Sequence, residues 1–183
     1  GLELGWRMTF WALSIIGVVT MVGIRMLIPV MPARSDTNLW REFAVFNRPQ
    51  VWISAFLSVL SFGGVIGGFT YIAFTLTQVS GFSAQTVPWL LVLFGVGTFI
   101  GNIYGGKAAD KSLNKSLGTI LLLLCVVMAA FALFARSQSM TVILLLMMGT
   151  VGLATAPGLQ LRMMKYASDA PTVASGTNIA AFN

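Results

Sequence analysis

The sequence contains no histidine and a single cysteine, Cys125, which lies inside an apolar run. Histidine catalysis, histidine metal sites and any disulfide or cysteine metal cluster within this chain are therefore excluded. Charged residues are also scarce, at 9% of the 183 residues, whereas soluble domains carry about 25%. The sequence shows no nucleophile–base pair and no phosphate-binding loop, so we predict neither an enzyme nor a cofactor.

Acidic residues are especially few. All five lie in polar segments or near the ends of apolar runs: Glu3, Asp36, Glu42, Asp110 and Asp169. We therefore expect no carboxylate in the middle of a membrane span. Proton-coupled pumps normally need a titratable group at that depth, so any such group is expected outside this chain.

The rest of the composition is typical of a membrane protein, since 57% of the residues are hydrophobic. We predict an all-α, polytopic membrane helical bundle, because the apolar runs approach the roughly 20 residues that a crossing needs. Five full spans are expected at residues 6–29, 51–76, 87–104, 117–134 and 141–164, with a truncated sixth from residue 172. The chain ends inside that apolar segment, so we expect it to be a fragment of a longer protein.

The polar segment 101–115 lies between two of these spans and carries Lys107, Lys111 and Lys115. Lysine density predicts a tight cytoplasmic turn. Strict alternation then places eight basic residues on the cytoplasmic side and two outside: Arg34, Arg41, Arg48, Lys107, Lys111, Lys115, Arg162 and Lys165 against Arg7 and Arg136. The net charge of +6 is explained by this bias, and we predict no nucleic-acid partner.

The second span carries small and polar residues at steps of 4, 3, 3, 4, 3, 4 and 3: Ser54, Ser58, Ser61, Gly64, Gly68, Tyr71, Thr75 and Gln78. These steps predict one continuous stripe on a helix, facing protein or water. We expect helix packing for its Ser/Gly half. For the outer half, a water-filled substrate cavity and simple packing are both open. Asn102, Gln160 and Asn178 in other spans complete the candidate cavity, with packing again the alternative.

Residues 31–50 form the longest polar segment, in which Leu39, Trp40, Phe43 and Phe46 recur at helical spacing. One interpretation is a short helix lying in the membrane interface. The other is a linker whose aromatic side chains pack on neighbouring helices. Further on, Ser168 or Asp169 is expected to cap the last segment, with Pro171 in its first turn.

Several of these stretches together resemble the major facilitator superfamily. Gly5-Trp6-Arg7-Met8-Thr9-Phe10 is similar to the entry to its sixth helix, and 31–50 is similar to the linker between its two six-helix halves. Gly106-Lys107-Ala108-Ala109-Asp110-Lys111 resembles the Gly-x-x-x-Asp-Arg/Lys signature loop between helices eight and nine, although Leu113 stands where the fuller signature has glycine. Residues 174–183 resemble helix eleven of the drug/proton antiporter branch, which includes arabinose and other sugar efflux permeases.

The resemblance implies a partial major facilitator fold. Residues 1–30 would be the last helix of the N-terminal bundle, 31–50 the cytoplasmic inter-bundle linker, and 51–183 helices seven to ten with the start of eleven. It also implies a cytoplasmic gate, in which Gly106 permits close packing, Asp110 pairs with or caps a neighbouring helix, and Lys111 completes the motif. The alternative is that Asp110 simply balances the three lysines.

The function implied is that of a secondary transporter of the bacterial inner membrane, exporting a sugar or a drug in exchange for protons. Its partners would be the lipid bilayer, the small-molecule substrate, protons and the N-terminal bundle of the same protein. The alternative is a non-transporting receptor or assembly protein with a transporter-like fold, because fold alone does not fix activity.

Overall fold

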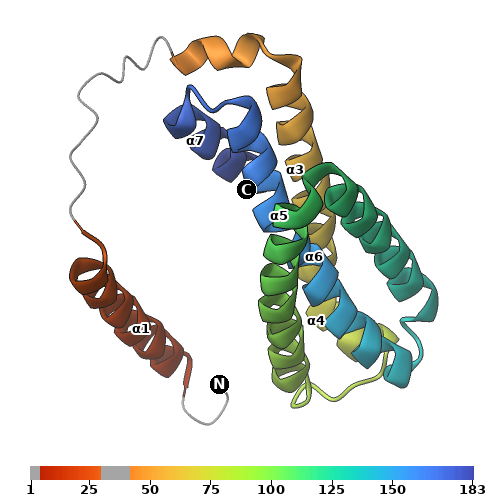
Figure 1. Cartoon of the computed structure of the whole chain (residues 1–183). Coiled ribbons are helices and arrows are strands. Elements are labelled where there is room, and N and C mark those ends of the chain that lie inside the picture. The colour runs from red at the N-terminus through yellow and green to blue at the C-terminus, as the bar shows by residue number, and fades with distance from the viewer. Residues whose placement is uncertain (1–4, 30–41) are drawn as a thin grey trace. The chain divides into compact units, whose positions relative to one another are not determined.

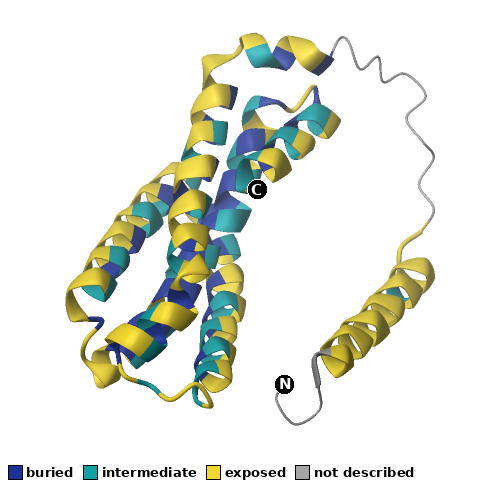
Figure 2. Ribbon diagram, turned by 180° about the vertical axis from the view of Figure 1, so that it is seen from behind, coloured by how far each residue is buried: buried dark blue, intermediate teal, exposed yellow. Residues whose placement is uncertain are grey.

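The computed structural model of the protein describes residues 5–29 and 42–183, and the regular structure among them is helical (Figure 1). The chain forms two compact units, Gly1–Thr37 and Asn38–Asn183. The described part of the first unit, residues 5–29, contains the helix α1, Gly5–Leu27, and nearly all of its described side chains are exposed (Figure 2). Two of its hydroxyl groups are satisfied within the helix, because Ser14 and Thr20 donate hydrogen bonds to the carbonyls of Phe10 and Ile16, each at 2.8 Å.

The second unit begins with the 3₁₀-helix η1, Phe43–Asn47, and the helix α3, Pro49–Thr70. A three-residue helix α4, Ile72–Phe74, and the π-helix η2, Thr75–Val79, continue α3. The helices α5, Val87–Phe134, α6, Gln138–Tyr166, and α7, Pro171–Phe182, complete it. The helices α3, α5 and α7 each carry proline in the first turn, where a missing N–H costs no helical hydrogen bond.

The helix α5 is interrupted at Ser112, whose φ of −163° and ψ of 88° are not helical. A straight helix of 48 residues would extend about 70 Å, more than twice the thickness of a bilayer core. Instead α5 reverses direction here, and its two arms are the green and teal segments of Figure 1. A tight reversal was predicted within the polar segment 101–115, and it lies at Ser112. The helical arms extend further into that segment than the spans 87–104 and 117–134 had allowed, since only Ser112 departs from helical geometry within α5.

Among the residues that the structure describes, four helices are long and apolar enough to cross a membrane: Arg7–Leu27, Pro49–Thr70, Val87–Phe134 and Gln138–Tyr166. The all-helical membrane class is thus confirmed. The predicted third and fourth spans appear as the two arms of α5, and α7 has 12 residues.

The helix α6 is the centre of the second unit, contacting α5, α3 and α7 (Figure 2). A seam of glycines brings the first arm of α5 against it, because Gly97, Gly101 and Gly105 face the backbone of α6 around Thr150 and Ala154. One apolar cluster lies near the start of α3 and includes Val45, Val51, Met163, Ala167, Ala170 and Ala174. A second lies toward the other end and includes Ile72, Leu76, Leu90, Val127, Leu145 and Met148.

Hydrogen bonds identify which helix ends meet. At one end, Arg162 of α6 reaches Asn114, just after the α5 reversal, and Gln50 at the start of α3. At the other, Ser80 donates to the Ala135 carbonyl at 2.6 Å and Gln138 to the Gly81 carbonyl at 3.1 Å. The basic residues predicted to share a side therefore gather at one end of this unit, opposite Arg136; Arg34 and Arg41 lie outside the described residues.

Candidate functional site

The predicted polar stripe on the second span is interrupted halfway. Its inner part is buried, with Ser54 and Ser58 fully covered and Ser61 nearly so. Beyond Ser61 the buried positions are different residues: Val65, Ile72, Leu76 and Ser80. The helix breaks at Tyr71, with φ −95° and ψ 6°, and then passes through the π turn of η2. The divergence begins before this break, inside the regular part of α3. At 3.6 residues per turn the buried face passes from Ser61 to Val65, whereas the predicted stripe steps to the exposed Gly64.

The outer residues of the stripe consequently lie away from the core. Tyr71 is 69% exposed, Gln78 is exposed, and Thr75 is half-buried with its hydroxyl donating to the Tyr71 carbonyl at 3.0 Å. Asn102 is likewise exposed, one residue beyond the buried Gly101 of the α5 seam. The prediction that these residues share one continuous helix face with Ser54, Ser58 and Ser61 is therefore wrong. Their role in a substrate cavity stays a prediction, since their surface is open within this unit.

The two remaining cavity candidates, Gln160 and Asn178, lie together in the interior. Asn178 is fully buried, accepts a hydrogen bond from Ser58 at 2.9 Å and donates through Nδ2 to Oε1 of Gln160. Gln160 in turn donates to the hydroxyl of Ser175 at 3.3 Å. The side-chain amides can act as donors and acceptors at once, which suits a junction of three helices. This cluster, Ser58–Gln160–Ser175–Asn178, connects α3, α6 and α7.

A second hydroxyl pair strengthens the same interface. Ser61 donates to Oγ1 of Thr155 at 3.1 Å, and Thr155 donates to the Gly152 carbonyl at 2.6 Å. Interhelical hydrogen bonds of this kind contribute about 0.6–2 kcal/mol each in a membrane. The groups of both networks have partners inside the protein, so their geometry indicates helix packing more than substrate contact.

Arg162 connects the helices at the polar end of the unit. The sequence had indicated only that this residue marks the end of a span. Its Nε donates to Ser54 at 3.2 Å, and its terminal nitrogens donate to Asn114 at 2.8 Å and to Gln50 at 3.3 Å. Its guanidinium also lies over the ring of Tyr166, 5.1 Å from the centroid. Arginine can bridge several acceptors because its five N–H groups are held in a rigid plane. Arg162 thereby joins α3, α6 and the reversal of α5.

The expected gate residues make few contacts of their own. A Cβ added to Gly106 would meet no atom within 4 Å, whereas one at Gly105 would overlap Ala154, so the close packing expected at Gly106 lies one residue earlier. Asp110 and Lys111 are exposed, and within the described ranges Asp110 forms no salt bridge or side-chain hydrogen bond. The gate stays a prediction that this unit alone does not complete.

An ion pair fastens the loop between α6 and α7. Both terminal nitrogens of Arg48 bind the Asp169 carboxylate, at 2.7 and 2.8 Å. The Arg48 hydrogen bonds hold the pKa of Asp169 below its ordinary value. The predicted capping of the last helix by Ser168 or Asp169 is wrong, because the N-cap is Ala170 without a side-chain bond and Asp169 is turned to Arg48. Pro171 does occupy the first turn.

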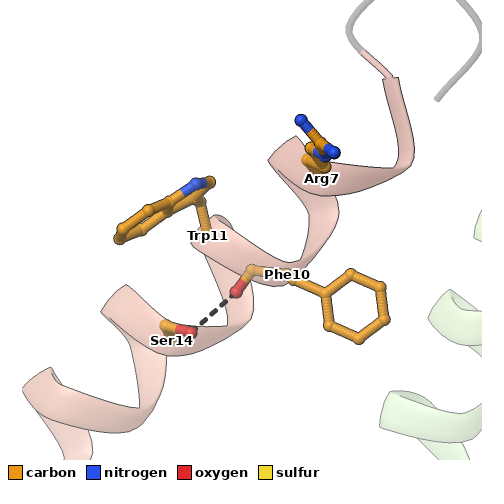
Figure 3. Close-up of a pocket in the computed structure, with 4 residues that line it drawn as sticks. All are labelled: Arg7, Phe10, Trp11 and Ser14. Atoms are coloured by element: carbon orange, nitrogen blue, oxygen red, sulfur yellow. Dashed lines mark hydrogen bonds between the residues drawn. The ribbon is translucent and has the colours of Figure 1, made fainter.

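The helix α1 has a shallow concavity on its own surface, drawn in Figure 3. Arg7, Phe10, Trp11 and Ser14 line it, and Ser14 donates to the Phe10 carbonyl at 2.8 Å. All four residues come from a single helix, so the concavity is a gap between neighbouring side chains and encloses nothing. It does not qualify as a binding site.

Comparison with known proteins identifies one family along the whole chain. The family model of the Major Facilitator Superfamily matches residues 2–183. The inner membrane transport protein YdhP of Escherichia coli (strain K12) is 39% identical over 183 residues, which is 100% of this chain and 47% of YdhP. The MFS-type transporter YtbD of Bacillus subtilis (strain 168) is 28% identical over 188 residues, covering 100% of this chain and 48% of YtbD. The chain thus spans about half the length of the curated relatives it matches.

Proposed function

Because the chain belongs to the major facilitator superfamily, we propose that the full-length protein is a secondary active transporter that exports a small molecule, a sugar or a drug, in exchange for protons. The observation that carries this proposal is the family match over residues 2–183, supported by 39% identity to a protein named for inner membrane transport. We propose the bacterial inner membrane as its location on the same grounds.

The domain assignment is part of this proposal. Residues 1–30 supply helix six, 31–50 the linker between the bundles, and 51–183 helices seven to ten with the start of eleven. On this assignment the two arms of α5 are helices eight and nine, which restores five crossings and a partial sixth. The lysine-bearing reversal and Arg162 then face the cytoplasm, in agreement with the positive-inside rule.

Transporters of this kind hold substrate near the midplane between two bundles that rock against each other. Rocking requires each bundle to move as one body, and the glycine seam between α5 and α6 supports that rigidity. Tyr71, Thr75, Gln78 and Asn102 offer an open surface with an aromatic ring and several hydrogen-bonding groups. A sugar or a polar drug requires both kinds of contact.

The proton-carrying group is proposed to lie outside the described spans. The acids among the described residues are Glu42, Asp110 and Asp169, and all belong to the polar end of the second unit. Neither the membrane helices α3 and α6 nor the described part of α1 contains an acid. Protons would then be bound by another part of the full-length protein.

The test is transport by the full-length protein in proteoliposomes with an imposed pH gradient, using a panel of sugars and cationic drugs. Gln78→Ala should weaken substrate binding by about 1 kcal/mol, the usual contribution of a hydrogen bond. Tyr71→Ala should cost more, because it also removes apolar contact area. Binding without gradient-driven transport would favour the receptor alternative. Lower melting temperature with unchanged affinity in both variants would remove these residues from the cavity.

A further inference from the structure

Glu42 is a buried carboxylate to which the proposed transport cycle assigns no role. It is 6% exposed, whereas Asp110 is exposed and the side chain of Asp169 is 62% exposed. Its Oε2 accepts a hydrogen bond at 3.2 Å from the backbone N–H of Val173, 131 residues later in the sequence. Burying a carboxylate is costly unless it is well bonded, so its position requires a compensating interaction.

The compensating interaction is with the amino end of α7. Its N-cap, Ala170, has no side chain that could cap the helix, and Pro171 has no N–H. The first intrahelical bond runs from Ala174 N to Ala170 O at 2.9 Å, which leaves the N–H groups of Thr172 and Val173 without helical partners. Glu42 therefore supplies from a distant segment the negative charge that favours this helix end.

Two further residues hold the same segment in place, and the geometry of η1 explains why. A 3₁₀-helix has three residues per turn, so Glu42, Val45 and Arg48 lie on one face. Val45 is 1% exposed in the apolar cluster with Met163 and Ala174. Arg48 binds Asp169 and donates to the carbonyl of Tyr166, the last residue of α6, at 2.9 Å. We name these three residues, Glu42, Val45 and Arg48, the clip.

The charges of the clip match the helix ends that they touch. Its acid contacts the amino end of α7, which is partially positive, and its base contacts the carboxyl end of α6, which is partially negative. Reversing the two charges would oppose both helix dipoles and the Asp169 pair. The charges therefore favour one orientation of the clip on α6 and α7. The segment before α3 lies at the same end of the unit as the start of α7 (Figure 1).

We propose that Glu42 is a positioning residue for transport, and that the clip sets the position of α7 against α3 and α6. The reason is that α7 carries Ser175 and Asn178 into the buried polar cluster with Ser58 and Gln160. Without the hydrogen bond from Val173 to Glu42, the amino end of α7 would be held less firmly. Ser175 and Asn178 would then be positioned less precisely against Ser58 and Gln160. The role in transport rests on the proposed function, whereas the positioning of α7 does not.

The experiment measures how readily a buried thiol in α7 reacts. In the full-length protein without other cysteines, including Cys125→Ser, Ala174→Cys reports on α7 and Leu117→Cys reports on α5, since both positions are buried. Glu42→Ala should raise the N-ethylmaleimide labelling rate of Ala174→Cys about tenfold, as local opening of one helix end would. The rate at Leu117→Cys should not change. Lys165→Ala, which removes an exposed charge in the last turn of α6, is the matched control and should change neither rate.

Two results would overturn the positioning role: unchanged labelling at Ala174→Cys, or an equal rise at both reporters, which indicates general destabilisation. If Glu42→Ala does not fold, Glu42→Gln carries the same test, because it keeps an oxygen acceptor and removes the charge; its rise should be about threefold.

Transport assays add a second readout that is independent of labelling. Glu42→Ala should lower the maximal rate about threefold with KM nearly constant, and Glu42→Asp should restore part of the rate. A changed KM with an unchanged maximal rate would contradict a positioning role. If no compound is transported by the unmodified protein, the proposed function fails while the labelling test still decides whether the clip positions α7.

Discussion

The glycine seam between α5 and α6 can be tested by adding a single methyl group. In Gly101→Ala the new Cβ would overlap the Thr150 carbonyl oxygen and lie 2.7 Å from the carbonyl carbon and 2.9 Å from Cα. These are backbone atoms, so no side-chain rotation can relieve the overlap and one helix must move. Gly95→Ala is the matched control on the same helix, because its Cβ would meet no atom within 4 Å.

The size of the effect follows from the difference between the two variants. Both gain about 1 kcal/mol of helix propensity in replacing glycine by alanine, and this gain cancels in the comparison. Forcing extra volume into a packed interface costs about 1–3 kcal/mol. We therefore expect Gly101→Ala to be less stable than Gly95→Ala by about that amount.

The assay is thermal unfolding of the full-length protein in detergent, with both variants measured in parallel. A melting temperature several degrees lower for Gly101→Ala than for Gly95→Ala is the expected result, and Gly105→Ala should behave like Gly101→Ala. Equal melting temperatures for Gly101→Ala and Gly95→Ala would show that α5 and α6 do not approach each other through this seam.

Three further predictions concern topology, the buried cluster and the ion pair. In a background containing Cys125→Ser, an impermeant maleimide should label Ser137→Cys in intact cells. It should label Ser112→Cys only after the membrane is permeabilised. Labelling of both variants in intact cells would contradict the proposed orientation. Asn178→Ala should lower the free energy of unfolding by about 1–3 kcal/mol, because Ser58 and Gln160 each lose a hydrogen-bond partner. Asn102→Ala, at an exposed position, should leave that free energy unchanged. Equal effects of the two substitutions would place Asn178 outside the packed interior. Arg48 lowers the pKa of Asp169, so the ion pair stabilises the fold above about pH 4 and loses that contribution as the pH falls through the lowered pKa. Asp169→Asn should therefore flatten the acid side of a plot of unfolding free energy against pH. An unchanged plot would show that the pair contributes nothing in solution.

The apolar pattern was sufficient to predict the all-helical class and several helix starts, while the count of five spans and a truncated sixth stays a prediction. A membrane helix must satisfy its backbone groups internally, so a long apolar run has few alternatives to a helix. Proline at positions 88 and 171 was expected in the first turn of a helix for a local reason, the missing N–H, and the structure confirms both. Pro49 occupies the same place in α3, although that helix was expected to begin at residue 51. The burial of Ser54, Ser58 and Ser61 was likewise predictable, because small polar residues in such a helix avoid lipid.

The failures share a different origin, which is rotation about a helix axis. Close packing was expected at Gly106 from the resemblance of its motif, whereas within this unit α6 approaches Gly105. In the same way, the predicted stripe steps from Ser61 to Gly64, whereas the packing of α3 buries Val65 and, beyond it, Ile72 and Leu76.

Local sequence patterns also could not predict which residues distant in the chain would form hydrogen bonds or ion pairs. Glu42 was expected only to lie in a polar segment, and Asp169 to cap its own helix. The structure places Glu42 at the amino end of α7 and pairs Asp169 with Arg48, 121 residues earlier. Such contacts arise because a buried charge or an unpaired N–H must find a partner somewhere in the fold, and the partner's distance along the chain does not enter that requirement.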